Sequence, residues 1–189
     1  VRNYIIDTYK DKFDAIVIID DDCNKIGFWE KQKYNIFDAE SLQEFFESMY
    51  ILTKDYGFKY FGLNCVTDKG AYKEHTPFAT NSFIGAPCSM ILTDTVCRYD
   101  EDIPLKEDYD FTLQNLKKYG GALRANFASY DVKQAKQVGG CAHTRNNTEE
   151  ERQFNLLQKK WGNKIIQKDN SSKRKFDFNP ILKSPIKGV

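Results

Sequence analysis

The stretch that decides the fold is Asp14-Ala-Ile-Val-Ile-Ile-Asp20-Asp21-Asp22. Its four consecutive aliphatic residues, 16–19, are typical of a buried strand in a parallel sheet that is covered on both faces. The three aspartates follow at the carboxyl end of that strand, where open α/β sheets bind their ligands. The sequence therefore predicts an α/β protein with a ligand site directly after residue 19.

Helices and strands alternate on both sides of this strand. Residues 1–10 and 40–55 show helical spacing, and Asp38 can cap the second helix. The strand, this second helix and a strand at 59–66 form a βαβ unit, which favours a parallel pair. Later in the chain the pattern predicts strands over 88–93 and 123–130, a helix over 108–119, and a helix opened by a capping box at 148–151.

These elements predict one domain over residues 1–167 with a mixed, mostly parallel sheet flanked by helices. Residues 168–189 are polar and Lys-rich, and we expect them to form a basic, extended tail.

Composition excludes several classes of protein. The 28 Lys and Arg nearly balance the 27 Asp and Glu, for a net charge of +1, which argues against a protein that wraps nucleic acid. With 41% apolar residues the chain can bury a core, so global disorder is excluded. The five cysteines are widely spaced and odd in number, which predicts a reducing, intracellular location and no disulfide framework. No apolar run is long enough to span a membrane.

The aspartates after the first strand are candidate metal ligands. Asp20 and Asp22 are two residues apart, so on an extended segment they lie on the same side and could bracket one ion. Such hard oxygen ligands suit Mg²⁺ or Mn²⁺, which would bridge to a diphosphate. Asp20 and Asp21 are the candidate residues of this segment for binding that ligand. The alternative is a solvated acidic turn that ends the strand.

A second acidic segment, with Glu107, Asp108 and Asp110, opens the helix at 108–119. One of these carboxylates could act as a general base toward an acceptor hydroxyl. The alternative is structural, because the helix dipole favours carboxylates in a first turn.

A third segment, Gly139-Gly-Cys-Ala-His-Thr-Arg145, combines groups that bind ligands. Gly139 and Gly140 permit close approach of the backbone to a ligand. His143 is a candidate third metal ligand, and Arg145 could pair with a phosphate. The alternative for His143 is an ordinary surface histidine.

Four stretches resemble a GT-A glycosyltransferase, and more narrowly the TET/JBP-associated glycosyltransferase group. They are AIVIIDDD at 15–22, IPLKEDYDF at 103–111, GGCAHTR at 139–145 and RQFNLLQKKW at 152–161. The similarity spans about residues 1–167. It implies a Rossmann-like GT-A fold and a metal-dependent enzyme that moves a sugar from a nucleotide-sugar, usually a UDP-sugar, to an acceptor hydroxyl. The cation would be Mn²⁺ or Mg²⁺.

The resemblance also implies roles for individual residues. Asp20 and Asp22 match the metal motif, Asp108 or Glu107 matches the acidic base, and His143 matches a further ligand by its place alone. The implied acceptor is a hydroxylated base in DNA, as in phage DNA modification in the bacterial cytoplasm.

The chain departs from the GT-A pattern at its beginning. GT-A folds begin with a strand and loop that hold the nucleotide, whereas residues 1–10 already form the helix before the DDD strand. We therefore expect the first βα portion to be missing or supplied by a second chain. This departure keeps two alternatives open, namely a nucleotidyltransferase using the same aspartates and a non-catalytic GT-A-like module for binding or assembly.

Overall fold

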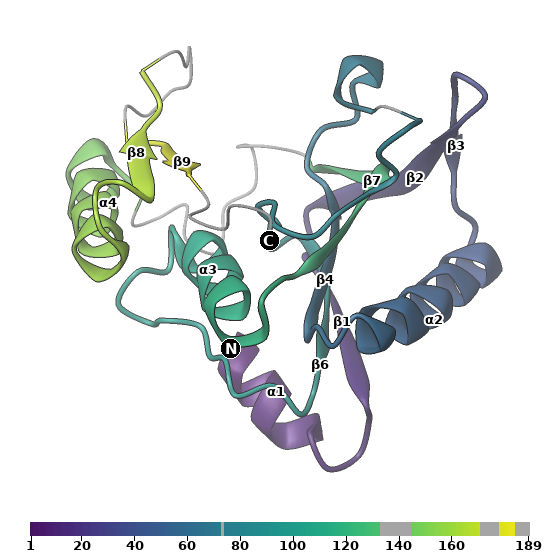
Figure 1. The fold of residues 1–189 in the computed structure, drawn as a ribbon, viewed down its shortest axis with the longest axis horizontal. Coiled ribbons are helices and arrows are strands. Elements are labelled where there is room, and N and C mark those ends of the chain that lie inside the picture. The colour runs from purple at the N-terminus through teal and green to yellow at the C-terminus, as the bar shows by residue number, and fades with distance from the viewer. Residues whose placement is uncertain (73, 133–144, 171–177, 184–189) are drawn as a thin grey trace.

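The computed structural model describes residues 1–72, 74–132, 145–170 and 178–183, and it confirms a mixed α/β fold (Figure 1). The helices are α1 (Arg2–Tyr9), α2 (Ala39–Asp55), α3 (Glu107–Tyr119) and α4 (Asn147–Trp161), with a short 3₁₀ helix at Lys69–Ala71. The strands are β1 (Ala15–Ile19), β2 (Cys23–Glu30), β3 (Lys33–Ile36), β4 (Tyr60–Asn64), β5 (Phe78–Ala79), β6 (Cys88–Leu92), β7 (Leu123–Val132), β8 (Ile166–Lys168) and β9 (Pro180–Leu182).

The main sheet has the strand order β1-β6-β4-β7-β2-β3, and β5 pairs with β7. Of the strand pairs described in this sheet, β4 and β7 are parallel and the other five pairs are antiparallel. The prediction of a mostly parallel sheet is therefore wrong, because the sheet is mixed and mostly antiparallel. Two features missed in the sequence explain the difference, namely the β2–β3 hairpin and the return of β6 between β1 and β4.

The predicted βαβ unit is confirmed in the direction of its two strands, but these strands do not pair with each other. β1 and β4 run the same way, but β6 lies between them and pairs antiparallel with both, so that Ile91 faces Ile16 on one side and Tyr60 on the other. The connection over residues 65–87 is long enough for the chain to turn back into that gap.

The first strand lies at the edge of the sheet, and the prediction that both its faces are covered is also wrong. Val17 and Ile19 keep 38% and 46% of their surface exposed. The β-branched run therefore reflects strand propensity and not double burial.

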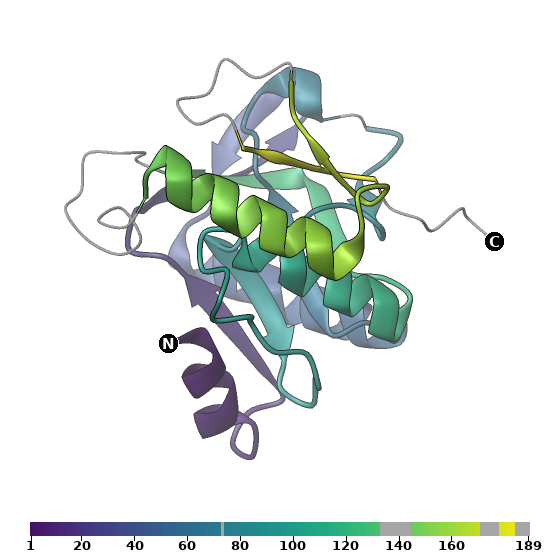
Figure 2. The ribbon, with the colours of Figure 1, turned by 90° about the vertical axis from the view of Figure 1, so that its left-hand side faces the viewer.

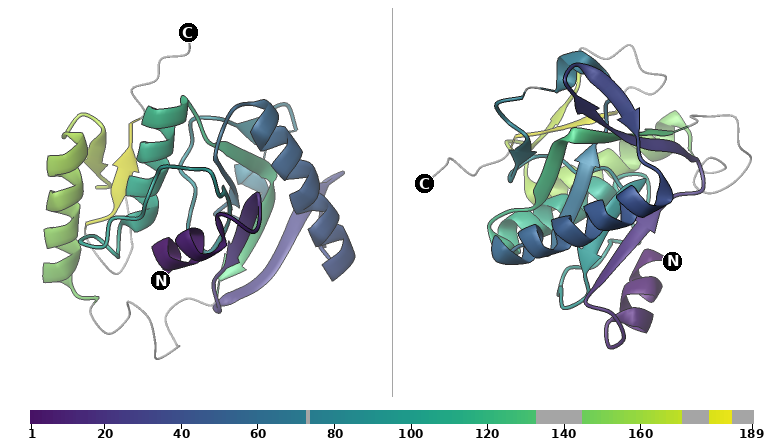
Figure 3. Two further views of the ribbon diagram at one scale, coloured as in Figure 1. Left: turned by 90° about the horizontal axis from the view of Figure 1, so that it is seen from below. Right: turned by 90° about the vertical axis from the view of Figure 1, so that its right-hand side faces the viewer.

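Helices cover the two faces of the sheet and enclose two cores. Seen from below, α2 lies on one face, α1 and α3 lie on the other, and α4 lies outside α3 (Figure 3). The core under α2 contains Phe46, Phe61 and Met90, and the core under α3 contains Tyr60 and Phe111. Tyr60 and Phe61 are neighbours in β4, so their alternation places one ring in each core.

The sheet must curl, because three residues connect its first strand to its fifth. In a flat sheet β1 and β2 would lie about 19 Å apart, at about 4.8 Å per strand spacing. The link is instead a tight turn, in which the Cys23 amide donates to the Asp20 carbonyl at 3.1 Å. The end of β1 and the start of β2 therefore lie within one turn of each other.

Local sequence accounts for the helix ends. The Asp38 side chain accepts from the Ser41 amide at 2.8 Å and caps α2, as predicted. Gly120 ends α3 with a φ of 76°, a left-handed angle that favours glycine. For α4 the predicted capping box is wrong, because Asn146 is the cap and accepts from the Glu149 amide at 2.9 Å.

The last described residues lie beside α4. Pro180–Leu182, from the segment expected to be a tail, forms β9 and pairs antiparallel with β8 (Figure 2). Among the described residues, no helix combines the length and apolarity needed to cross a membrane.

Candidate active site

Three strands direct their carboxyl ends to one edge of the sheet. β1 and β4 both run opposite to β6, and β7 runs parallel to β4. The aspartates that follow β1 therefore lie at the same edge as the carboxyl ends of β4 and β7. This edge is where a ligand site was predicted, although the sheet around it is mixed.

The turn at residues 20–22 is fixed at both ends. The Asp20 amide donates to the Pro87 carbonyl at 2.9 Å, and the Asp20 carbonyl accepts from Cys23. Asp21 is exposed, whereas Asp20 and Asp22 are half-buried. The prediction of an extended segment that places Asp20 and Asp22 on the same side is therefore wrong, because these residues form a turn. The turn holds Asp20 and Asp22 in place, and Asp21 extends toward solvent.

Glu107 and Asp108 form the first turn of α3. Both are partly buried, and the Asp108 carboxylate accepts from the Tyr109 amide at 2.9 Å. The dipole of α3 favours these negative charges, as the structural alternative required.

Arg2 joins the two acidic segments. Its Nη2 donates to both oxygens of Asp20, at 2.7 and 2.9 Å, and its Nε donates to Glu107 at 2.8 Å. The guanidinium also lies 5.7 Å from the centre of the Tyr99 ring. Carboxylates that are 87 positions apart in sequence thus share one cation, and this contact brings together the predicted metal motif and the predicted base segment.

Three of the carboxylates at this edge hold a proton more tightly than an ordinary carboxylate. Burial, together with Asp20 and Asp21, raises the pKa of Asp22 above its ordinary value. Burial also raises the pKa of Glu107, against the opposing effect of Arg2. The pKa of Asp108 rises to about 6, mainly because of burial and with a smaller contribution from Glu107. An added cation would favour the ionised form of these carboxylates, against both burial and the smaller repulsion between them.

Asp22 carries the observation that best fits a cation. Its Oδ1 is buried and has no hydrogen-bond partner among the residues that the structure describes. A buried carboxylate oxygen without a donor is costly, and a divalent ion would satisfy it.

The described residues do not form a complete metal cage. Within residues 1–72, 74–132, 145–170 and 178–183, no three His, Cys, Asp or Glu side chains form a group that could hold a metal ion. Two carboxylates still suffice for Mg²⁺ or Mn²⁺ when substrate phosphates and waters supply the remaining ligands. The donor set therefore fits a cation that is shared with a diphosphate.

An ion cluster with a buried centre connects the start of α3 to α4. Lys106, which precedes the first turn, donates to Glu150 of α4, and both side chains are almost completely buried. Arg145 donates to the other oxygen of Glu150 at 2.5 Å. The predicted phosphate ligand Arg145 thus contacts a structural carboxylate.

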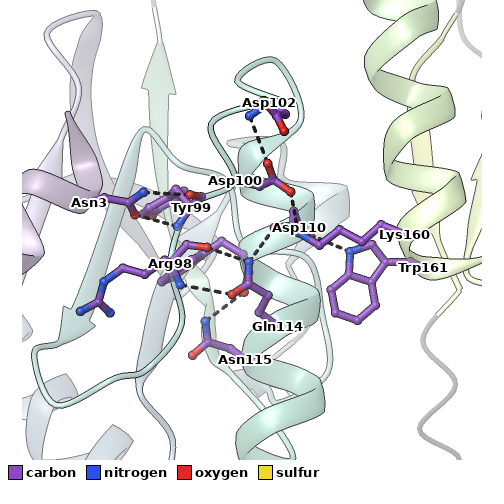
Figure 4. Close-up of polar contacts among 11 residues, drawn as sticks. Asn3, Arg98, Tyr99, Asp100, Asp102, Asp110, Gln114, Asn115, Lys160 and Trp161 are labelled. Atoms are coloured by element: carbon purple, nitrogen blue, oxygen red, sulfur yellow. Dashed lines mark hydrogen bonds and ion pairs between the residues drawn. The ribbon is translucent and has the colours of Figure 1, made fainter.

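Asp110, the remaining acid of this segment, has a structural role. It is fully buried, and its oxygens accept from Trp161 at 2.7 Å, Gln114 at 2.6 Å and Lys160 at 3.0 Å (Figure 4). These bonds fasten the end of α4 to α3. A shallow hollow of about 330 Å³ beside this network contains none of the carboxylates at the sheet edge; it is lined by Asp100, Asp102, Ile103, Leu156, Lys159 and Lys160.

The structure gathers part of the predicted site. It links Asp20 to Glu107 through Arg2, with Asp22 close to Asp20 and Asp108 close to Glu107, and it leaves Asp21 exposed. Gly139, Gly140 and His143 lie outside the described residues, so their roles as ligand-binding and metal-binding residues stay predictions.

Arg2 is the residue that the sequence reasoning missed. Arg2 and the buried Ile6 are four residues apart in α1, so they share the helix face that meets the protein. A basic residue on that buried face was the available signal that it pairs with an acid.

No protein-family model, no curated protein and no solved structure matches this chain.

Proposed function

We propose that this chain is the glycosyltransferase domain suggested by its resemblance to the GT-A fold, moving a sugar from a nucleotide-sugar to an acceptor hydroxyl. The observation that supports this most is the convergence of the Asp20–Asp22 turn and the Glu107–Asp108 turn on one sheet edge. A cation ligand and a proton acceptor must lie near each other for one substrate to meet both.

The cation in this proposal is Mn²⁺ or Mg²⁺, held by Asp22 and Asp20. When bound, it neutralises charge on the diphosphate of a UDP-sugar. The raised pKa of Asp22 and its unpartnered oxygen support its place as a ligand.

Asp108 is the better candidate for the general base. With a pKa of about 6 it is mostly ionised at pH 7, yet basic enough to accept a proton from a hydroxyl. Glu107 is bound by Arg2, which holds its carboxylate in an ion pair. We therefore assign proton transfer to Asp108 and a positioning role to Glu107.

The experiment is release of UDP from a panel of UDP-sugars with Mn²⁺. Asp22→Asn and the double variant Asp20→Asn, Asp22→Asn should lose at least 100-fold in rate, a typical loss for a group that stabilises transition-state charge (about 10²–10³-fold). Asp14→Asn is the matched control, because Asp14 lies exposed at the opposite end of β1. Turnover in the double variant equal to the parent's would refute the proposal.

The acceptor, a hydroxylated base in DNA, rests on the resemblance alone. Mass spectrometry of nucleosides after incubation with such DNA and a UDP-sugar tests it directly. An intracellular location is part of the same proposal, and it rests on the wide spacing and odd number of the cysteines.

One observation favours the non-catalytic alternative. Both oxygens of Asp20 accept from Arg2, so this carboxylate is satisfied without a metal ion. Calorimetry with UDP and Mn²⁺ separates the two functions, because a binding or assembly module that lacks the nucleotide site gives no heat. Including nucleoside triphosphates in the donor panel tests the nucleotidyltransferase alternative.

A further inference from the structure

Arg2 occupies the carboxylate that a metal ion would need. Its Nη2 lies 2.7 and 2.9 Å from the two Asp20 oxygens, which is a close, charge-assisted contact. A dication on Asp20 would lie next to this guanidinium. The two positive charges would repel each other strongly, because the Arg2 and Asp20 side chains are partly buried. The two cations cannot both hold Asp20 at full strength.

We propose that Arg2 is a built-in competitor of the divalent cation, pairing with Asp20 and Glu107 in its absence and leaving Asp20 when the ion binds. This inference rests on the proposed function, since it takes Asp20 and Asp22 as the metal ligands. It adds a residue that controls metal affinity and that couples the metal motif to Glu107.

The helix that carries Arg2 can stay docked when the arginine side chain leaves Asp20. Asn3 and Tyr99 exchange two hydrogen bonds, each 2.8 Å long (Figure 4). Asp7 pairs with Arg98 at 2.7 Å, and Ile6 is completely buried. Only the arginine side chain needs to move, which makes the exchange local.

The exchange also changes Glu107. In the metal-free arrangement Arg2 binds both carboxylates at once, so loss of the Asp20 contact frees part of the guanidinium. The cation therefore alters the charge around the first turn of α3 without contacting it. Two sites that share one binding partner are coupled by linkage.

The test measures Mn²⁺ affinity by electron paramagnetic resonance of the free ion. Arg2→Met should bind Mn²⁺ about tenfold more tightly than the parent, within the usual range of coupling between sites. Arg2→Lys should fall between the two, because lysine keeps the charge but has a single point of contact.

Two controls separate competition from simpler effects. Lys25→Met removes the positive charge three residues after Asp22, which pairs loosely with Asp131 at 3.8 Å, so a general charge effect would tighten binding in this variant too. Asp7→Asn loosens α1 without touching Asp20. Competition predicts that both controls change Mn²⁺ affinity less than twofold.

A double-mutant cycle completes the test. In an Asp20→Asn background Arg2 has lost the contested carboxylate, so Arg2→Met should no longer tighten binding. If Arg2→Met binds Mn²⁺ as the parent does, or more weakly, Arg2 is not a competitor, although the metal site survives. If neither the parent nor any variant binds Mn²⁺, both the inference and the proposed metal site fail.

Discussion

Asp108 and Asp110 are two residues apart on the first turns of α3, yet their surroundings are opposite. Asp110 is fully buried and accepts from a lysine, an indole and an amide. Asp108 accepts from the Tyr109 amide and has a pKa of about 6. The same residue type therefore has two roles. Several hydrogen-bond donors make the buried carboxylate of Asp110 structural, whereas the scarcity of donors leaves the carboxylate of Asp108 more basic.

The contrast extends to the acids around them. Glu150, below the helix start, is paired with Lys106 and Arg145, whereas Asp22, at the sheet edge, has a buried oxygen with no partner among the described residues. Acids with several charged or polar partners and acids with few therefore occur in the same small protein, and substitutions can test each kind.

The largest effect is expected at Glu150. Glu150→Gln removes the charge that compensates the buried Lys106, and breaking a buried pair in this way costs about 3–5 kcal/mol. Urea unfolding measures the loss. Glu151→Gln is the control, because Glu151 lies exposed next to Glu150 on α4, so the free energy of unfolding should stay nearly unchanged. Equal effects at both positions would contradict the structural role of the Lys106–Glu150 pair.

A smaller loss is expected at Asp110. Asp110→Asn turns one acceptor into a donor facing Gln114 or Lys160, so the unfolding free energy should fall by roughly 2–3 kcal/mol. The indole of Trp161 provides a local readout, because its fluorescence should shift when the 2.7 Å bond to Asp110 weakens. Unchanged stability and fluorescence would show that this network does not fasten α4.

The opposite sign is expected at Asp108. Its folded pKa of about 6 lies above the ordinary value of 3.8, so ionisation destabilises the folded state as pH rises through this window. Asp108→Asn should therefore be more stable than the parent by roughly 1–3 kcal/mol at pH 8 and lose this advantage below about pH 4. Urea unfolding from pH 4 to 8 measures the difference, and a destabilised variant at pH 8 would reverse the comparison.

The smallest effect is expected at Arg145. Arg145→Met removes a second, partly exposed partner of Glu150 while Lys106 remains, so the loss should be about 1 kcal/mol or less. The same unfolding assay compares it with Glu150→Gln. A loss as large as that of Glu150→Gln would mean that Arg145, and not Lys106, is the partner that matters.

The sequence predicted elements better than their arrangement. Runs such as 16–19 and the apolar stripe of α2 carry their periodicity locally, and both elements are confirmed. The β2–β3 hairpin escaped notice because its turn, Lys31-Gln32, has left-handed φ angles of 45° and 68° without the glycine or asparagine that usually marks such turns. Strand order is set by long-range pairing, which no local pattern records.

The acidic residues of the candidate site were likewise predicted from the sequence, whereas the arginine that pairs with them was missed. Asp20 and Asp108 stand in acidic clusters directly beside predicted elements, a pattern that one stretch of sequence displays. The partner of Glu107 is 105 positions away, so only the fold reveals Arg2. The distinction between Asp108 and Asp110 also depends on α4, whose Lys160 and Trp161 reach just one of them.

The three-residue link between β1 and β2 has a consequence for how this protein can change. Because the link is so short, it keeps the end of β1 close to the start of β2 and so keeps the sheet curled. The same three residues are Asp20, Asp21 and Asp22. Lengthening the loop would let the sheet open and would carry Asp20 and Asp22 apart. The length of this link is thus as restricted as the residue types in it. Insertions should be tolerated far more readily in other surface loops than between Ile19 and Cys23.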